Sequence, residues 1–240
     1  MPEFSDKGLI IRLKKYGEHD AVATFFTQNH GVLTAFVKRA FSKRHSGVMQ
    51  VGNLTALTYK ARLEEQLGVA VCENMAAYAG KAMANPDSLG ILSCICALLT
   101  FLPEGIAEEE LFSAVLTQAD LLDREGVYER YAEFEVLLLA VLGFGLDLSC
   151  CALTGDTENL AYVSPKSGRA VSLAAGEPWK GKLLDLPAFL WNKNVSCTGF
   201  SDIKKALALT GFFLENYVCK HINCDFPPVR RRLFERVSAK

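Results

Sequence analysis

Hydrophobic and polar residues alternate along the first seventy or so residues with the period-2 spacing that is typical of β-strands. Turns that contain glycine or asparagine separate the apolar segments at intervals of roughly ten residues. This pattern predicts five short strands, at residues 8–14, 21–27, 32–37, 54–60 and 64–72. Five short strands over this length favour a small closed barrel, and the five-stranded Greek-key OB-fold fits both the number and the length.

After residue 80 the apolar positions take the spacing of helices. Helices are predicted at residues 86–102, 108–122, 127–142, 185–191, 201–219 and 229–237. Residues 149–182 are rich in Gly, Ser, Thr and Asn, which indicates an irregular insertion or a small β-element. The predicted fold class is therefore α+β, with an OB-fold barrel over residues 1–80 and a mainly α-helical C-terminal domain over residues 81–240.

The formal net charge of −1 conceals an uneven distribution. Residues 1–80 carry a net charge of +3 and residues 191–240 carry +5, whereas residues 81–149 carry −9. Two basic ends and an acidic middle point to a polyanionic partner for the ends.

The segment at residues 36–47 contains four cations, no acidic residue and the turn between two predicted strands. Loops of an OB-fold are recurrent oligonucleotide sites, so this loop is predicted to bind a phosphate backbone. A solvated, mobile turn is the alternative. The candidate DNA-binding residues are Lys14, Lys15, Lys38, Arg39, Phe41, Lys43, Arg44, Lys60 and Arg62.

Two phenylalanines lie in this segment. Phe36 belongs to an alternating strand and is predicted to lie in the core. Phe41 is in the loop itself and is the better candidate for stacking on a base.

Three consecutive arginines, Arg230, Arg231 and Arg232, begin the last predicted helix. They cover more than one helical face, which exceeds what helix capping needs. They are predicted to form a second basic contact, with phosphate or with an acidic peptide. A solvated helix end is the alternative.

The cysteines and histidines give no recognisable metal or catalytic motif. Zinc sites need paired ligands, and Cys150 and Cys151 are followed by Thr154 where a Cys-x-x-Cys pair would close. Cys94 and Cys96 lie in an apolar helix and are predicted to pack in the core. No phosphate-cradling glycine motif, catalytic triad or paired metal carboxylates occur. We therefore expect no cofactor, no metal and no enzymatic activity.

The chain has no apolar run long enough to span a bilayer and begins without a signal-peptide pattern. It is predicted to be cytoplasmic, with reduced cysteines.

The chain resembles the RecO family of recombination mediators over essentially its whole length. The similarity rests on the order and spacing of several blocks, none of which is as specific as a nucleotide-binding motif. These blocks are residues 8–11, 17–18, 30–31, 37–44, 61–68, 134–148, 151–155, 162–168 and 227–233. The resemblance implies an N-terminal OB-fold that binds DNA, followed by a helical domain.

The resemblance also implies a function. Such a protein binds single- and double-stranded DNA and anneals complementary strands. It helps load RecA onto DNA coated by single-strand-binding protein (SSB), together with RecR, in a bacterial cytoplasm and near the nucleoid. The helical domain would recognise the acidic tail of SSB, which ends in phenylalanine. Some members carry a four-cysteine zinc site, from which this chain departs at Thr154 and around Gly168.

Two other hypotheses stay open. The chain could be a protein-interaction adaptor that recognises acidic peptide tails without direct DNA binding. It could also be a cysteine-dependent enzyme or a metalloprotein, which no local motif supports.

Overall fold

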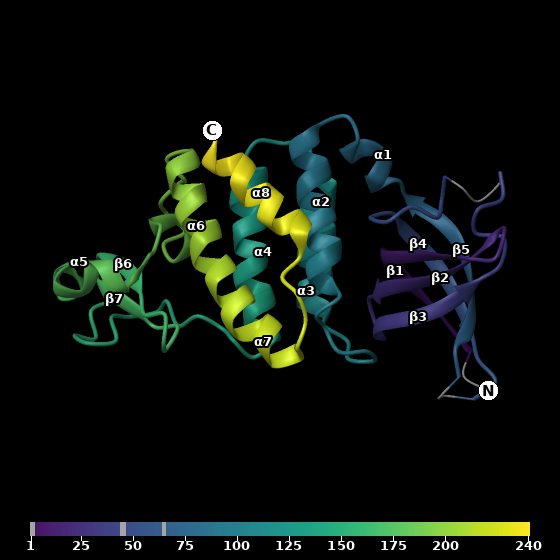
Figure 1. Cartoon of the computed structure of the whole chain (residues 1–240), viewed down its shortest axis with the longest axis horizontal. Helices are drawn as coiled ribbons and strands as arrows, with labels where there is room; N and C mark the ends of the chain where they lie inside the picture. The colour runs from purple at the N-terminus through teal and green to yellow at the C-terminus, as the bar shows by residue number, and fades with distance from the viewer. Residues whose placement is uncertain (1–2, 44–46, 64–65) are drawn as a thin grey trace. The chain divides into compact units, whose positions relative to one another are not determined.

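Five strands close into a barrel at the N-terminal end of the chain (Figure 1). The structure is a computed structural model, and it describes residues 3–43, 47–63 and 66–240. The strands are β1 (Glu3–Tyr16), β2 (Asp20–Thr27), β3 (Gly31–Val37), β4 (Leu54–Lys60) and β5 (Gly68–Ala76), and their order around the barrel is β1-β2-β3-β5-β4. The β3–β5 pair is parallel and the other pairs are antiparallel. The predicted five-stranded barrel is confirmed.

Alternate residues of each strand point into the barrel, as the period-2 pattern requires. The core contains Ile10, Ala21, Ala23, Phe25, Ala35, Val37, Ala40, Met49, Leu57, Tyr59, Ala61, Ala70 and Cys72. Gly68 begins β5 against the ring of Tyr59, where an added Cβ would lie 2.3 Å from the ring. Only glycine allows the backbone to approach so closely.

Strand β1 is longer than predicted, because it begins at Glu3 rather than residue 8. Its first half contains Asp6, an acidic residue whose side chain is fully buried. The carboxylate accepts hydrogen bonds from the backbone N–H groups of Lys7 (2.8 Å) and Asn29 (3.0 Å) and from the Asn29 amide (2.9 Å). His30 Nδ1 lies 2.6 Å from it. These partners compensate for the burial of the charge.

Three helices follow the barrel: α1 (Tyr78–Ala82), α2 (Pro86–Leu99) and α3 (Glu109–Asp120). Asn85 caps α2 by accepting a hydrogen bond from the Asp87 backbone N–H at 2.8 Å. Cys94 and Cys96 are buried on α2, which confirms the predicted core packing. The Phe26 ring of β2 meets Phe112 of α3 edge-on, with 5.5 Å between centroids.

The rest of the chain is mainly helical, with a small three-stranded sheet of order β7-β6-β8. Its elements are α4 (Val127–Val141), β6 (Leu160–Val163), β7 (Ala170–Ser172), α5 (Leu173–Gly176), η1 (Glu177–Lys182), β8 (Leu184–Asp185), η2 (Ala188–Leu190), α6 (Phe200–Phe213), η3 (Leu214–Val218), α7 (Cys219–Ile222) and α8 (Pro228–Ser238). Helix α6 packs against both α4 and α8 (Figure 1). The α+β fold class predicted from the sequence is confirmed.

Two helix predictions change in detail. The predicted helix at residues 201–219 is α6 continued through a π-helical turn, η3, into α7. The predicted helix at residues 185–191 is wrong, because this segment contains the end of β8 and a short 3-10 turn. Pro187 explains the difference, since a proline disfavours the helical conformation of the residue before it.

The chain forms two compact units, residues 1–125 and residues 126–240. Helices α1, α2 and α3 therefore belong to the same unit as the barrel. The predicted domain boundary after residue 80 remains a proposal. Among the helices of the described residues, none is both long enough and apolar enough to cross a membrane.

Candidate nucleic-acid interface

A single row of paired residues crosses the outer face of the barrel. Lys60 pairs with Val69, Val69 with Phe36, Phe36 with Val22, and Val22 with Lys14. Paired residues on adjacent strands point to the same side of a sheet, so all five side chains point away from the core. The row spans four strand-to-strand steps, or roughly 19 Å. It therefore has an apolar and aromatic centre with a cation at each end.

The basic loop after β3 is held against the β1–β2 turn by its backbone. Arg39 has a positive φ of 53°, and its N–H donates to the Asp20 carboxylate at 2.7 Å. The N–H of Phe41 donates to the His19 carbonyl at 2.9 Å. These bonds fix the course of the loop and leave the side chains of Lys38, Arg39 and Lys43 exposed. Arg44 lies outside the described residues.

Strand register brings the loop close to the lysines of β1. Lys15 pairs with Ala21, Ala21 pairs with Val37, and Lys38 directly follows Val37. Lys14 and Lys15 therefore lie at the same end of the β1-β2-β3 ladder as Lys38. The structure thus places three of the predicted cations, Lys14, Lys15 and Lys38, at the same end of this ladder.

Most of these cations are exposed and are not paired with a carboxylate among the described residues. In the parts of the chain that the structure describes, no ion pair involves Lys14, Lys15, Lys38, Arg39 or Arg62. Their side chains are exposed, so each keeps a charge that can meet an anion.

Lys60 differs from these five cations, because its Nζ lies 2.8 Å from the carboxylate of Glu3. Both side chains are about half exposed, at 55% and 54%. Lys60 and Arg62 line a hollow of about 420 Å³ whose walls include Val69 and Val71. This hollow gives the Lys60 end of the row an apolar wall.

The aromatic residues differ from the prediction. Phe41 is half-buried and packs against the barrel core. Phe36, predicted in the core, lies instead on the outer face, where its ring meets Tyr16 edge-on with 5.6 Å between centroids. Tyr16 is 62% exposed and was not predicted as a site residue. Continuing the alternation from Lys14 would have placed Tyr16 on the cationic face.

The C-terminal arginines do not form one surface. Arg230 is 1% exposed and donates to the Glu135 carboxylate, with 2.9 Å between Nη2 and Oε2, and to the Leu207 carbonyl at 2.8 Å. The hydroxyl groups of Tyr131 and Thr210 donate to the same carboxylate. The predicted role of Arg230 in a second basic contact is therefore wrong, because Glu135 already neutralises this cation inside the unit.

The helical period explains why Arg230 is buried. On α8, Arg230, Leu233 and Val237 occupy one face, and all three are buried. Arg231 and Arg232 fall on other faces and are exposed. Arg231 donates to Glu215 at 2.7 Å and lies over the Phe226 ring, 5.6 Å from its centroid.

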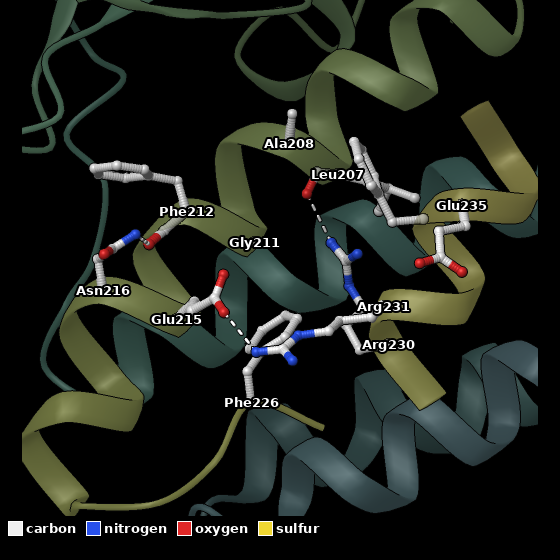
Figure 2. A pocket seen from close by; sticks show the side chains of 11 residues that line it. Leu207, Ala208, Gly211, Phe212, Glu215, Asn216, Phe226, Arg230, Arg231 and Glu235 are labelled. Atoms are coloured by element: carbon white, nitrogen blue, oxygen red, sulfur yellow. Dashed lines mark hydrogen bonds and ion pairs between the residues drawn. The ribbon is translucent and has the colours of Figure 1, made fainter. Parts of the chain in front are cut away.

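A pocket of about 410 Å³ lies between α6 and α8 (Figure 2). Leu207, Phe212 and Phe226 contribute apolar walls, and Arg231 and Glu215 form an ion pair beside them. Figure 2 shows Arg230 pointing from α8 toward the Leu207 carbonyl of α6. The pocket is thus mainly apolar and carries charge at one side.

Cys151, in the segment after α4, has a thiol that accepts hydrogen bonds from its neighbours. Cys151 is buried, and its Sγ accepts a hydrogen bond from the Ser172 backbone N–H at 3.2 Å. Burial raises the pKa of this thiol, but hydrogen bonds from Ser172, Thr154 and Leu153 outweigh burial and bring the pKa to about 6. Within the described residues, no group of three or more His, Cys, Asp or Glu side chains is placed to hold a metal ion. The absence of a metal stays a prediction.

Comparison with known proteins gives matches over nearly the whole chain. The family model described as "Recombination protein O N terminal" matches residues 1–71, and "Recombination protein O C terminal" matches residues 83–223.

Individual relatives carry the name "DNA repair protein RecO". The relative from Rhodospirillum rubrum is 38% identical over 244 residues, covering 99% of this chain and 97% of the relative. The relative from Methylobacterium nodulans is 40% identical over 237 residues, covering 97% and 96%. The relative from Paracoccus denitrificans is 40% identical over 240 residues, covering 99% and 97%.

Proposed function

The chain belongs to the RecO family of DNA repair proteins, and on that premise we propose that it is a non-catalytic DNA-binding mediator. It binds single- and double-stranded DNA and anneals complementary strands. With RecR, it helps load RecA onto DNA coated by SSB. We place this activity in the bacterial cytoplasm, at the nucleoid.

The observation that carries the proposal is the outer face of the barrel. Lys14 lies on this face beside the aromatic pair of Tyr16 and Phe36. Lys15, Lys38 and Arg39 are exposed at the adjoining end of the β1-β2-β3 ladder. Cations that neutralise phosphates release condensed counterions, and this release drives binding. An aromatic face accepts stacked bases without regard to sequence, which suits a protein that acts on any strand.

The mechanism of annealing is electrostatic. Two complementary strands repel each other through their phosphates, and a surface that neutralises part of one strand lowers this repulsion. Complementary bases then meet more often, and pairing itself supplies the remaining free energy. No bond in the nucleic acid is made or broken, so no general acid, base or nucleophile is needed.

The test is the combined substitution of Lys14, Lys15, Lys38 and Arg39 by alanine. Each lost contact with a single strand lowers the slope of log affinity against log salt by about 0.7, so the slope should fall by about 3. Affinity at low salt should fall at least tenfold, and annealing should slow in parallel. Fluorescence anisotropy of a labelled oligonucleotide across a salt series measures affinity and slope together.

A matched control removes the same formal charge from exposed positions in the other compact unit, by changing Lys166, Lys193, Lys220 and Arg232 to alanine. The control should keep most of the salt slope. Equal weakening by both variants would mean that overall charge, rather than the barrel face, governs binding.

A second candidate function concerns the pocket between α6 and α8. We propose that it receives the acidic, phenylalanine-ending tail of SSB, with the terminal ring against the apolar walls and a carboxylate near Arg231. The volume of about 410 Å³ and the apolar walls of the pocket support this assignment. The peptide carboxylate would replace Glu215 as the partner of Arg231. A labelled peptide of this kind should bind, whereas the same peptide with its terminal phenylalanine changed to alanine should not. Arg231→Glu should abolish binding of the first peptide and leave oligonucleotide binding unchanged.

A further inference from the structure

A second group of exposed cations lies in the unit of residues 126–240, around an exposed tryptophan. Trp179, Lys180 and Lys182 belong to the short helix η1, and Lys204 and Lys205 belong to α6. Trp179 is 53% exposed, and the four lysines are also exposed. None of these residues was singled out by the sequence pattern, because the two lysine pairs are separated along the chain.

The fold brings the two pairs together. Strand β8 directly follows η1 and packs against α6. Lys180, Lys204 and Lys205 consequently line one hollow of about 560 Å³. The apolar residues Leu209 and Phe234 also line this hollow.

The charge of the hollow is positive. Of the described residues that line it, one is acidic, Asp185, and three are lysines. Within residues 3–43, 47–63 and 66–240, none of Lys180, Lys182, Lys204 and Lys205 takes part in an ion pair. The four lysines are exposed, and of these Lys205 interacts electrostatically with the Asp202 carboxylate. The hollow keeps an excess of positive charge beside apolar residues, where screening is weak.

Trp179 has one cation over its ring, since Lys182 Nζ lies 5.6 Å from the centroid. A contact of this kind at an exposed site stabilises the fold only slightly. More than half of the side chain stays open to solvent, which is unusual for so large an apolar group. An exposed aromatic ring among lysines is the combination by which proteins bind single strands, with bases on the ring and phosphates on the cations.

We infer that Trp179, Lys180, Lys182, Lys204 and Lys205 form a second single-stranded DNA contact, in addition to the barrel face. A base stacks on Trp179, and the adjoining phosphates lie along the lysines that line the hollow. The inference rests on the proposed function and extends it, because it gives each of two strands a separate surface. Annealing then requires both surfaces, and loss of either surface weakens the binding of a single strand.

The chain has two tryptophans, Trp179 and Trp191, which makes a local optical test available. In a Trp191→Phe variant all tryptophan emission comes from Trp179. Titration with a deoxythymidine oligomer should quench this emission in a saturable and salt-dependent way. The matched Trp179→Phe variant, which keeps Trp191, should show no such quenching.

Binding measurements complete the test. In the Trp191→Phe background, changing the four lysines to alanine should lower the salt slope of the quenching by about 3 and raise its midpoint at least tenfold. In the otherwise unchanged chain, Trp179→Ala should lower the annealing rate about tenfold. Circular dichroism would establish that each variant is folded.

Three results would overturn the inference. The first is unchanged Trp179 emission while anisotropy reports oligomer binding, which would leave the barrel face as the site and the proposed function intact. The second is quenching by an acidic peptide but not by the oligomer, which would assign the surface to a protein partner. The third is the absence of oligomer binding even in the unsubstituted chain, in which case the proposed function fails as well.

Discussion

Two runs of cations that look alike in the sequence have opposite environments in the structure. In the loop after β3, Lys38 and Arg39 are exposed, and no ion pair among the described residues involves them. At the start of α8, Arg230 is buried against Glu135, whereas Arg231 pairs with Glu215 at the surface. Cations that are adjacent in the sequence can therefore differ in whether the fold supplies a carboxylate for their side chains.

The difference comes from the elements that pack against each run of cations. The backbone N–H groups of the loop bond to Asp20 and His19, and the side chains of Lys38, Arg39 and Lys43 are left exposed. Helix α8 turns 100° per residue, so three consecutive arginines must point in three directions. One of these directions is the interior, where α4 and α6 supply a carboxylate, two hydroxyl groups and a carbonyl oxygen.

The largest effect that would test this contrast is at Arg230. Changing Arg230 to alanine leaves the Glu135 carboxylate buried without its cation, which should lower the free energy of unfolding by about 3–5 kcal/mol. Urea unfolding followed by circular dichroism measures the change. Arg232→Ala, a matched loss of an exposed arginine on the same helix, should change stability by less than about 0.5 kcal/mol.

A double substitution distinguishes the contribution of the Arg230–Glu135 charge pair from that of the surrounding packing. Replacing Glu135 by leucine together with Arg230 by methionine removes both charges, and it should recover most of the lost stability. Failure of the double variant to recover would mean that packing and the hydroxyl network, rather than charge pairing, set the cost at this position.

The barrel has a buried charge of its own at Asp6, and changing it to asparagine should have the next largest effect. Burial opposes ionisation of this group, but hydrogen bonds involving His30, Asn29 and Lys7 outweigh burial and hold its pKa below the usual 3.8. Asparagine cannot reproduce these charge-assisted bonds, so Asp6→Asn should lower the free energy of unfolding by about 2–3 kcal/mol at neutral pH.

The stabilisation by ionised Asp6 should depend on pH in a defined direction. Because the folded protein keeps Asp6 ionised to lower pH than the unfolded chain does, the unfolded chain binds more protons as the pH falls below 3.8. The stabilisation is therefore full above about pH 5 and decreases on acidification. Unfolding curves of both proteins between pH 7 and pH 3 should converge at the acid end. A constant difference would argue against an ionised Asp6.

These two buried groups also show what the sequence could and could not predict. The barrel follows from local alternation and turn residues, and four of its strands were placed to within a few residues. Strand β1 was predicted too short, because its first half buries Asp6, which alternation alone assigns to solvent. The partners that are distant in sequence, Asn29 and His30, lie in the turn between β2 and β3.

In the candidate interface, too, some features could be predicted from the sequence and others could not. The exposed loop cations could be predicted from composition and turn position. The burial of Arg230 could not, because its partner Glu135 is far away in the sequence and only the packing of α4, α6 and α8 brings them together. Tyr16 was missed although the signal was local, since alternation from Lys14 places it on the same face.

The aromatic pair tests whether the barrel face contributes more than charge. Tyr16→Ala and Phe36→Ala should each weaken binding of a single strand by roughly 1 kcal/mol, or about fivefold, through lost stacking. The salt slope should stay unchanged, because no phosphate contact is removed. Phe41→Leu is the matched control, since Phe41 packs against the barrel core. A changed slope in the Tyr16 variant would show that the substitution had moved the neighbouring cations.

The smallest effect is at Glu3, and it decides whether Lys60 is an exposed, available cation or a neutralised one. The Glu3–Lys60 pair is half exposed, so Glu3→Gln should change the free energy of unfolding by less than about 1 kcal/mol. If Lys60 forms the far end of a strand-binding row, its release should strengthen single-strand binding about twofold and steepen the salt slope by up to about 0.7. Lys60→Ala should then have the opposite effect on both quantities. If neither variant changes affinity or slope, the bound strand stops short of β4, and the interface is confined to β1, β2, β3 and the loop that follows them.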